Sequence, residues 1–302
     1  MDGRDADGGA SGAGAGDGAA DTDADDGGDI DDDVDADGES GVPADHPRRE
    51  SLVTRERIEA GVEAGITSRQ GLVAQGRGEA FDYLLGEGTI PSADRAARAA
   101  AAQLLLAERP VLSVNGNVAA LVPGEVVDLA AATGADIEVN LFHRTPDRVE
   151  AIADHLRAHG AEAVKGLAGD ARIPGLSHDR ARVDADGIAA ADTVLVPLED
   201  GDRAAALAAL GKVEIVIDLN PLSRSARAAA IPIVDNVVRA VPNVAAHARD
   251  LADAPPDRLR ETVRAFDADA ARADAERTIR EGIGRTGDGA ERDGGDAGAG
   301  GR

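Results

Sequence analysis

The stretch DLNPLSRSA, residues 218–226, places one carboxylate, one amide, two hydroxyls and one guanidinium directly behind the apolar run VEIVI. A tight turn does not need an arginine between two serines, so the position of Arg224 calls for a chemical reason. A guanidinium presents a fixed fork of N–H donors that pairs with phosphate through two hydrogen bonds. The composition of this stretch therefore favours a binding site for a negatively charged ligand.

Three further arginines are candidates for the same task. Arg55 falls on a predicted helix, Arg77 lies between glycines in GRGE, and Arg144 follows a predicted strand. Glycine on both sides of Arg77 would let the backbone approach a ligand closely, although glycines near a loop also serve as plain turn residues. A local group of arginines would allow an acidic chain to bind a polyanion.

Polar side chains also follow the other predicted strands, namely Asn115, Asn117, His143 and Asp202. Each has a plainer interpretation. The two asparagines could only shape a turn, and His143 could be a structural or surface residue. The segment EDGDR (199–203) could be a solvated turn in which Asp202 caps a helix. From the residues alone, these positions indicate strand ends that could bind a phosphorylated ligand, and no more.

Short apolar runs alternate with helical segments along most of the chain. Strands are predicted at 111–114, 137–142, 193–198, 213–218 and 231–235. Helices are predicted at 51–64, 78–87, 92–108 (capped by Ser92), 123–134, 145–160, 202–211, 237–254 (broken near Pro242) and 256–281. This alternation predicts an α/β fold with an open, mostly parallel, Rossmann-like sheet and flanking helices. In such sheets ligands bind beyond the carboxyl ends of the strands, which is where the polar stretches fall.

The two ends of the chain differ from the rest. Residues 1–43 and 282–302 consist mainly of Gly, Ala and Asp, with few large apolar side chains. Such segments cannot offset their ordering entropy by burial, so both are expected to be disordered acidic tails. Between them we expect one α/β domain, 44–281, with N-terminal helices over 50–108, a Rossmann-like core over 109–255 and a C-terminal helix over 256–281.

The formal net charge of −25 disfavours binding to nucleic acid or to anionic membranes, because phosphate would be repelled. Dense Asp is also typical of a protein working at high salt, where charge repulsion is screened. The sequence shows no membrane span, no signal peptide and no cysteine, so a cytoplasmic protein is expected. It also contains no phosphate-loop lysine motif, no GxGxxG after a strand and no cluster of metal ligands, so no dedicated metal site is predicted.

A series of longer motifs resembles archaeal phosphopantothenate synthetase, also called 4-phosphopantoate–β-alanine ligase. The similarity covers about residues 45–255, without the acidic tails. The motifs are HPR (46–48), GRGEAFDYL (76–84), SVNGNVAALVP (113–123), EVNLFHRT (138–145), RIPGL (172–176), VPLEDGDR (196–203) and IDLNPLSRSAR (217–227).

The resemblance implies an ATP-dependent, Mg²⁺-using homodimer that joins 4-phosphopantoate to β-alanine through an acyl-adenylate. The products would be 4'-phosphopantothenate, AMP and diphosphate, on the route to coenzyme A. The ATP contacts that it implies are Arg55, Arg77, Asp218, Leu219, Asn220, Arg224, Ser225, Asn236 and Val237. Asn115, Asn117, His143 and Arg144 are then candidates to hold phosphopantoate. Glu199, Asp200 and Asp202 are candidates for Mg²⁺ or the β-alanine ammonium.

Two alternatives stay open at this point. One is another nucleotide-dependent ligase, or a kinase, acting on a small phosphorylated acid. The other is a non-catalytic regulator that binds a nucleotide without turnover. Several different polar strand ends, more than one nucleotide needs, favour an enzyme with more than one substrate, and we take Arg224, Asn115, His143 and Asp202 as its candidate catalytic residues.

Overall fold

The computed structural model describes residues 41–43, 45–46, 48–197 and 201–288, and from Val42 onward these belong to one compact unit. The predicted tails, 1–43 and 282–302, lie largely outside the described residues. The last helix, α11 (Ala268–Asp288), nevertheless continues beyond residue 281. None of the described helices combines the length and apolar character that crossing a bilayer requires.

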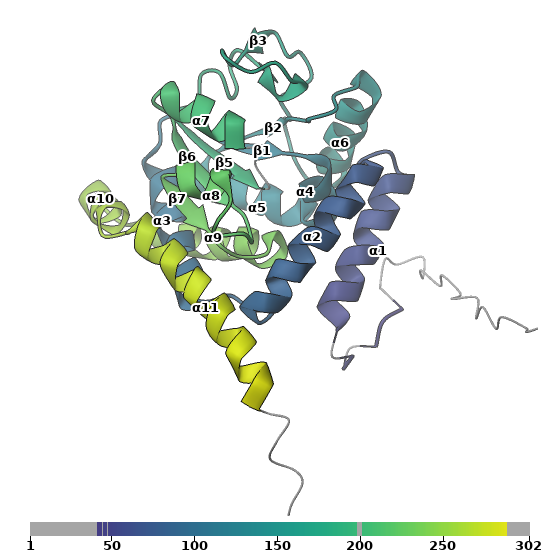
Figure 1. Cartoon of the computed structure of the whole chain (residues 1–302). Coiled ribbons are helices and arrows are strands. Elements are labelled where there is room, and N and C mark those ends of the chain that lie inside the picture. The colour runs from purple at the N-terminus through teal and green to yellow at the C-terminus, as the bar shows by residue number, and fades with distance from the viewer. Residues whose placement is uncertain (1–40, 44, 47, 198–200, 289–302) are drawn as a thin grey trace, which may run out of the picture. The chain divides into compact units, whose positions relative to one another are not determined.

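Five parallel strands form the main sheet in the order β2-β1-β5-β6-β7 (Figure 1). Their bounds are β1 (Pro110–Val114), β2 (Asp136–Val139), β5 (Thr193–Pro197), β6 (Val213–Ile217) and β7 (Ile231–Ile233). A separate antiparallel pair consists of β3 (Ala171–Arg172) and β4 (Arg182–Val183). The predicted mostly parallel α/β fold is confirmed. The chain reverses its direction of travel across the sheet between β1 and β5, so a topological switch point lies at their carboxyl ends.

The strands are mostly apolar and almost entirely buried because both faces of the sheet are covered. Consecutive residues of a strand point to opposite faces. Leu112 and Leu195 join the core cluster shared with α3 (Pro91–Leu106), α5 (Pro123–Thr133), α6 (Pro146–Ala158) and α9 (Val237–Leu251). Val111 and Val194 join a second cluster with Leu207 of α7 (Gly201–Ala209). The sheet is therefore the middle layer of three.

The remaining helices are α1 (Arg49–Glu63), α2 (Arg69–Leu85), α4 (Gly116–Leu121), α8 (Arg224–Ala228) and α10 (Pro256–Arg264), with a 3₁₀ turn at Asp179–Ala181. Thr145 caps α6, since its side chain accepts a hydrogen bond from the Arg148 N–H, and the predicted helix 145–160 begins at this residue. Gly86 and Gly134 end α2 and α5 in the left-handed conformation, with φ of 92° and 70°. Local cap chemistry was therefore sufficient to place these three helix ends.

Helix α2 is much longer than the predicted 78–87, and its first half was wrongly interpreted as a loop because it contains glycines. Gly76 and Gly78, on either side of Arg77, lie inside the helix. Gly71 has a packing role: a Cβ there would lie 2.2 Å from Asn117 Oδ1 and 2.4 Å from Thr67 Cγ2. At this position glycine allows α2 to approach its neighbours closely, rather than forming a turn.

Three smaller predictions were also wrong. Helix α3 is capped at Ile90 with Pro91 as its first residue, so Ser92 is not the cap; the fixed φ of proline suits that first position. Helix α9 continues through Pro242, because its buried apolar face outweighs one missing N–H donor. The predicted helix 256–281 is interrupted at 265–267, where the Asp267 side chain accepts a hydrogen bond from the Ala270 N–H and starts α11.

Candidate functional site

Three pockets lie along α2 at the carboxyl edge of the sheet. The Arg77 pocket has about 260 Å³ and is lined by Ala74, Arg77, Gly78, Phe81, Asp218, Leu219, Asn220, Ser223 and Ser225. The His143 pocket has about 200 Å³ and is lined by Ser68, Gln70, Gly71, Ala74, Asn115, Gly116, Asn117, Leu141, Phe142, His143, Arg148 and Arg180. The Asn236 pocket has about 120 Å³ and is lined by Arg48, Glu50, Ser51, Thr54, Gln75, Glu79, Asp82, Glu87 and Asn236. Ala74 is common to the first two, which therefore adjoin.

The Arg77 pocket contains five of the residues proposed for ATP. The loop behind β6 is shaped by its own side chains, since Asp218 accepts from the Asn220 N–H at 2.9 Å and Asn220 accepts from the Leu222 N–H at 3.0 Å. Ser223 caps α8 by accepting from the Ala226 N–H at 3.0 Å. Two Asx turns and a serine cap therefore shape the loop through its own side chains.

Burial raises the pKa of Asp218, while the Ser223 hydroxyl, the Asn220 N–H and the charge of Arg77 oppose that rise. A positive charge that moves closer would therefore favour the ionised carboxylate. Phe81 and Leu219 add apolar wall to the same pocket, in which Arg77 forms no ion pair within the described residues. The arrangement combines an apolar wall, a guanidinium and a carboxylate, which suits a ligand with a flat ring and a charged group.

Arg224 and Asp202 are brought together. The guanidinium donates to Asp202 at 2.7 Å, and both side chains are largely exposed. Gly201 allows the contact, because a Cβ there would lie 2.5 Å from the Cβ of Arg224. The candidates Glu199 and Asp200 lie outside the described residues. Arg224, the first residue of α8, lies between the pocket residues Ser223 and Ser225 in sequence but does not line the Arg77 pocket.

The His143 pocket is lined by three of the four residues proposed to hold phosphopantoate, Asn115, Asn117 and His143, but much of their hydrogen-bonding capacity serves the fold. Asn115 caps α4 by accepting from the Val118 N–H at 3.1 Å, and it donates to the Pro197 carbonyl at 3.0 Å across the switch point. Asn117 donates to the Gly71 carbonyl at 3.0 Å. His143 Nε2 lies 2.7 Å from Gln70 Oε1.

Two arginines that the sequence analysis did not single out, Arg148 and Arg180, line this pocket, and a third that it did single out lies elsewhere. Arg148 donates to the carbonyls of His143 and Ile66 at 2.6 and 3.2 Å. Arg144 does not line this pocket; its Nη2 instead donates to the carbonyls of Gly166 and Leu167. Arg148 and Arg180 each fall within a helical turn, and nothing in the local sequence distinguishes them from solvated arginines.

Of the other predicted ATP contacts, only Asn236 lines the Asn236 pocket, while Arg55 and Val237 lie next to its lining residues in sequence or contact. Arg55 on α1 forms a two-pronged ion pair with Glu79 on α2, at 2.9 and 2.5 Å, which holds the pKa of Glu79 below its usual range. Val237 is buried in the core, so a ligand could meet only its backbone. Its N–H has no hydrogen-bond partner among the described residues. Asn236 caps α9, accepting from the Val238 N–H at 3.3 Å.

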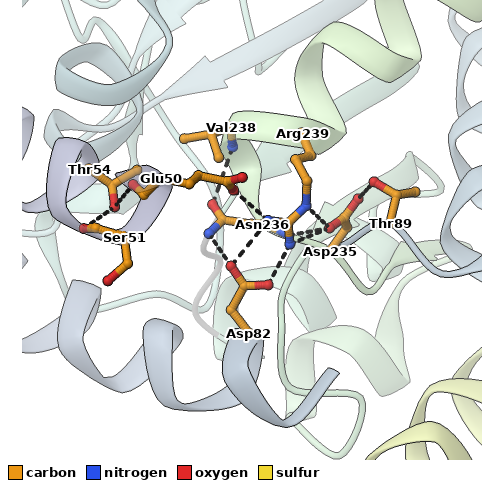
Figure 2. A network of polar contacts seen from close by, with 9 residues as sticks. All are labelled: Glu50, Ser51, Thr54, Asp82, Thr89, Asp235, Asn236, Val238 and Arg239. Carbon is orange, nitrogen blue, oxygen red and sulfur yellow. Dashed lines mark hydrogen bonds and ion pairs between the residues drawn. The ribbon is translucent and has the colours of Figure 1, made fainter. Parts of the chain in front are cut away.

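A buried polar network surrounds Asn236 (Figure 2), and the sequence analysis missed its centre, Arg239. Arg239 pairs with Asp82 of α2, Asp235 behind β7 and Glu50 of α1. Asp82 also accepts from the Asn236 side-chain amide at 2.7 Å. The one available signal was Asp235 four residues before Arg239, the spacing of neighbours on a helix face. The four predicted residues 55, 77, 224 and 236 therefore share one edge of the sheet but do not share one pocket.

Within the part of the chain that the structure describes, no group of three or more His, Asp or Glu side chains could hold a metal ion. Magnesium in nucleotide sites needs only one or two carboxylates, because phosphate oxygens and water complete its shell. Asp218, which lines the Arg77 pocket, is one described carboxylate that fits such a role.

Similarity to known proteins extends over most of the described chain. Residues 92–282 match the family described as phosphopantothenate/pantothenate synthetase. The chain is 56% identical over 227 residues to the 4-phosphopantoate–β-alanine ligase of Thermococcus onnurineus, which covers 75% of this chain and 87% of the relative. It is 57% identical over 226 residues to the enzyme of the same name from Methanosarcina mazei, covering 75% of this chain and 89% of that one. The chain belongs to the phosphopantothenate/pantothenate synthetase family.

Proposed function

We propose that this chain is a 4-phosphopantoate–β-alanine ligase of coenzyme A biosynthesis. It would use ATP to join the two substrates and release 4'-phosphopantothenate, AMP and diphosphate. The observation that carries the proposal is the identity of more than half of the aligned residues with ligases of that name, along nearly the whole length of those relatives. The three pockets along α2 supply the physical counterpart, because a three-substrate reaction needs more than one binding pocket.

The nucleotide is assigned to the Arg77 pocket and its surroundings. Phe81 and Leu219 would contact the base, and Arg77, Ser225 and Arg224 would face the phosphates. Arg224 is suited to this because its partner Asp202 is exposed, so that the pair can open without stranding a buried charge. Asp218 and Asn220 would hold Mg²⁺, which neutralises phosphate charge when it is bound.

The phosphorylated acid is assigned to the adjoining His143 pocket, where Arg148, Arg180 and His143 supply positive charge or N–H donors beside the nucleotide. A carboxylate is a poor electrophile, and transfer of adenylate to it creates a good leaving group for attack by the amine of β-alanine. Both steps build up negative charge, so fixed cations and donors would supply most of the catalysis. Asp202, with Glu199 and Asp200, remains a candidate to hold the β-alanine ammonium.

The assembly and setting are also proposals. We expect a homodimer and a cytoplasmic protein, as the resemblance and composition indicated. The net charge of −25 supports an enzyme adapted to high salt. AMP formation compared at low and molar salt would test the adaptation to high salt, and light scattering on the same samples would test the homodimer.

The test of the proposed reaction is a product assay on the full chain. We expect AMP from ATP only when phosphopantoate and β-alanine are both present, with none when either is omitted. ADP as the product would instead indicate a kinase or a phosphate-releasing ligase. Binding of ATP without any turnover would favour a non-catalytic regulator.

A further inference from the structure

Asn236 is attached at two points to carboxylates that Arg239 holds (Figure 2). Its main-chain N–H donates to Asp235 Oδ1 at 2.8 Å, and the same oxygen accepts from Arg239 Nε at 3.0 Å. Its side-chain amide donates to Asp82 Oδ2 at 2.7 Å, and Arg239 Nη1 lies 3.3 Å from the same oxygen. The Arg239 guanidinium therefore holds both carboxylates that accept hydrogen bonds from Asn236.

The network is buried where it meets Asn236 and exposed at its far end. The side chains of Asp235 and Asp82 are 1% and 8% exposed, and that of Arg239 is 16% exposed. The Thr89 hydroxyl donates a hydrogen bond to Asp235 Oδ2 at 2.6 Å. Buried charges of this kind persist only when every partner is in place, so the geometry has little freedom.

The third carboxylate, Glu50, reaches Arg239 from α1 at 2.5 Å. Arg239 of α9 therefore connects the loop behind β7 with helices α1 and α2. Arg55 lies on α1 and Arg77 on α2. The planar fork of arginine can serve three carboxylates in this way, whereas the ammonium group of lysine is a single point of charge.

We propose that Arg239 is a positioning residue for the nucleotide site. By pairing with Asp82 and Asp235 it sets the orientation of Asn236, and the adjacent Val237 N–H stays free for the ligand. This inference rests on the proposed function, in which the nucleotide contacts residues 236 and 237. Arg239 itself need not touch the substrate. Its removal would release Asn236 to rotate, which weakens ATP binding more than the binding of the other substrates.

The experiment compares Arg239→Met, Arg239→Lys and the control Arg57→Met by titration calorimetry with ATP, steady-state kinetics and thermal unfolding. Arg57 also fastens α1 to the rest of the fold, through the Leu121 carbonyl at 3.1 Å, but it does not contact the network. For Arg239→Met we expect ATP affinity to fall roughly 10- to 100-fold, the range seen when an orienting group is lost, with the KM for β-alanine unchanged.

For Arg239→Lys we expect partial rescue, because the charge remains while the fork is lost. Arg57→Met should lower the unfolding temperature without changing ATP affinity. If Arg239→Met does not fold, the lysine variant decides the question. ATP affinity equal to wild type in a folded Arg239 variant would overturn the role of Arg239. Failure of the wild type to form AMP would instead count against the proposed ligase, since the calorimetric comparison does not depend on turnover.

Discussion

Arg224 and Arg239 lie at the same edge of the sheet but differ in burial and in the number of carboxylates with which they pair. Arg224 is 74% exposed and pairs with a single carboxylate, Asp202, which is 62% exposed. Arg239 is 16% exposed and pairs with three carboxylates, two of them buried. Both lie next to residues proposed to contact ATP.

The difference in burial decides what each arginine can do. An exposed ion pair contributes about 0–1 kcal/mol, so Arg224 can exchange Asp202 for a phosphate at little cost. Breaking a buried pair leaves an uncompensated charge, so Arg239 cannot exchange its partners. The accessible arginine is therefore suited to binding a ligand, and the buried one to holding other residues in place.

The most severe test of this contrast is Asp82→Ala. Removing one buried partner of Arg239 should lower the free energy of unfolding by about 3–5 kcal/mol. Urea denaturation at fixed salt measures it. The matched control is Asp274→Ala, which removes a more exposed carboxylate that pairs with Arg95 and Arg277. Equal losses of unfolding free energy in the two variants would mean that the buried network contributes no more to stability than a more exposed ion pair.

Arg224→Ala should have the second largest effect, and on catalysis rather than stability. Losing one group that stabilises charge in the transition state should cost about 2–4 kcal/mol in kcat/KM for AMP formation. The unfolding free energy should change by no more than about 0.5 kcal/mol, as for most surface substitutions. Arg227→Ala, an exposed arginine on the same helix, removes the same charge and serves as the control. Wild-type kcat/KM in Arg224→Ala would remove Arg224 from the site.

The strands and several helix ends could be predicted from the sequence because their causes are local. Buried runs such as VEIVI can be recognised without knowing their distant partners. Thr145 begins a helix through its side-chain hydroxyl, and Gly134 ends one because glycine adopts the left-handed conformation easily. The extent of α2 could not be predicted, because the tightest contact at Gly71 is with the side chain of Asn117, far along the chain. A glycine that permits packing and a glycine that makes a turn look the same in sequence.

The candidate site shows the same limit. Residue type and strand ends were enough to select the loop at 218–226, and the structure brings Asp218, Asn220 and Ser225 into one pocket with Arg77. The partners of an arginine are not visible in sequence, however. Arg144 is held by backbone carbonyls, and Arg239 in the apolar-patterned helix VVRAVPNVAA was passed over although it organises the network.

Asp202→Ala should produce the smallest effect and separate the two arginines by their response to salt. Deleting the exposed partner of Arg224 should change the free energy of unfolding by at most about 1 kcal/mol at low ionic strength. That difference should disappear in molar salt, where the Debye length is about 3 Å and exposed charges are screened. The loss caused by Asp82→Ala should persist under the same conditions, since ions cannot enter a buried network. Urea denaturation of both variants across a salt series gives the comparison directly. A stability loss in Asp202→Ala that survives molar salt would mean that the Arg224 pair is part of the fold and that Arg224 is not free to turn to a phosphate.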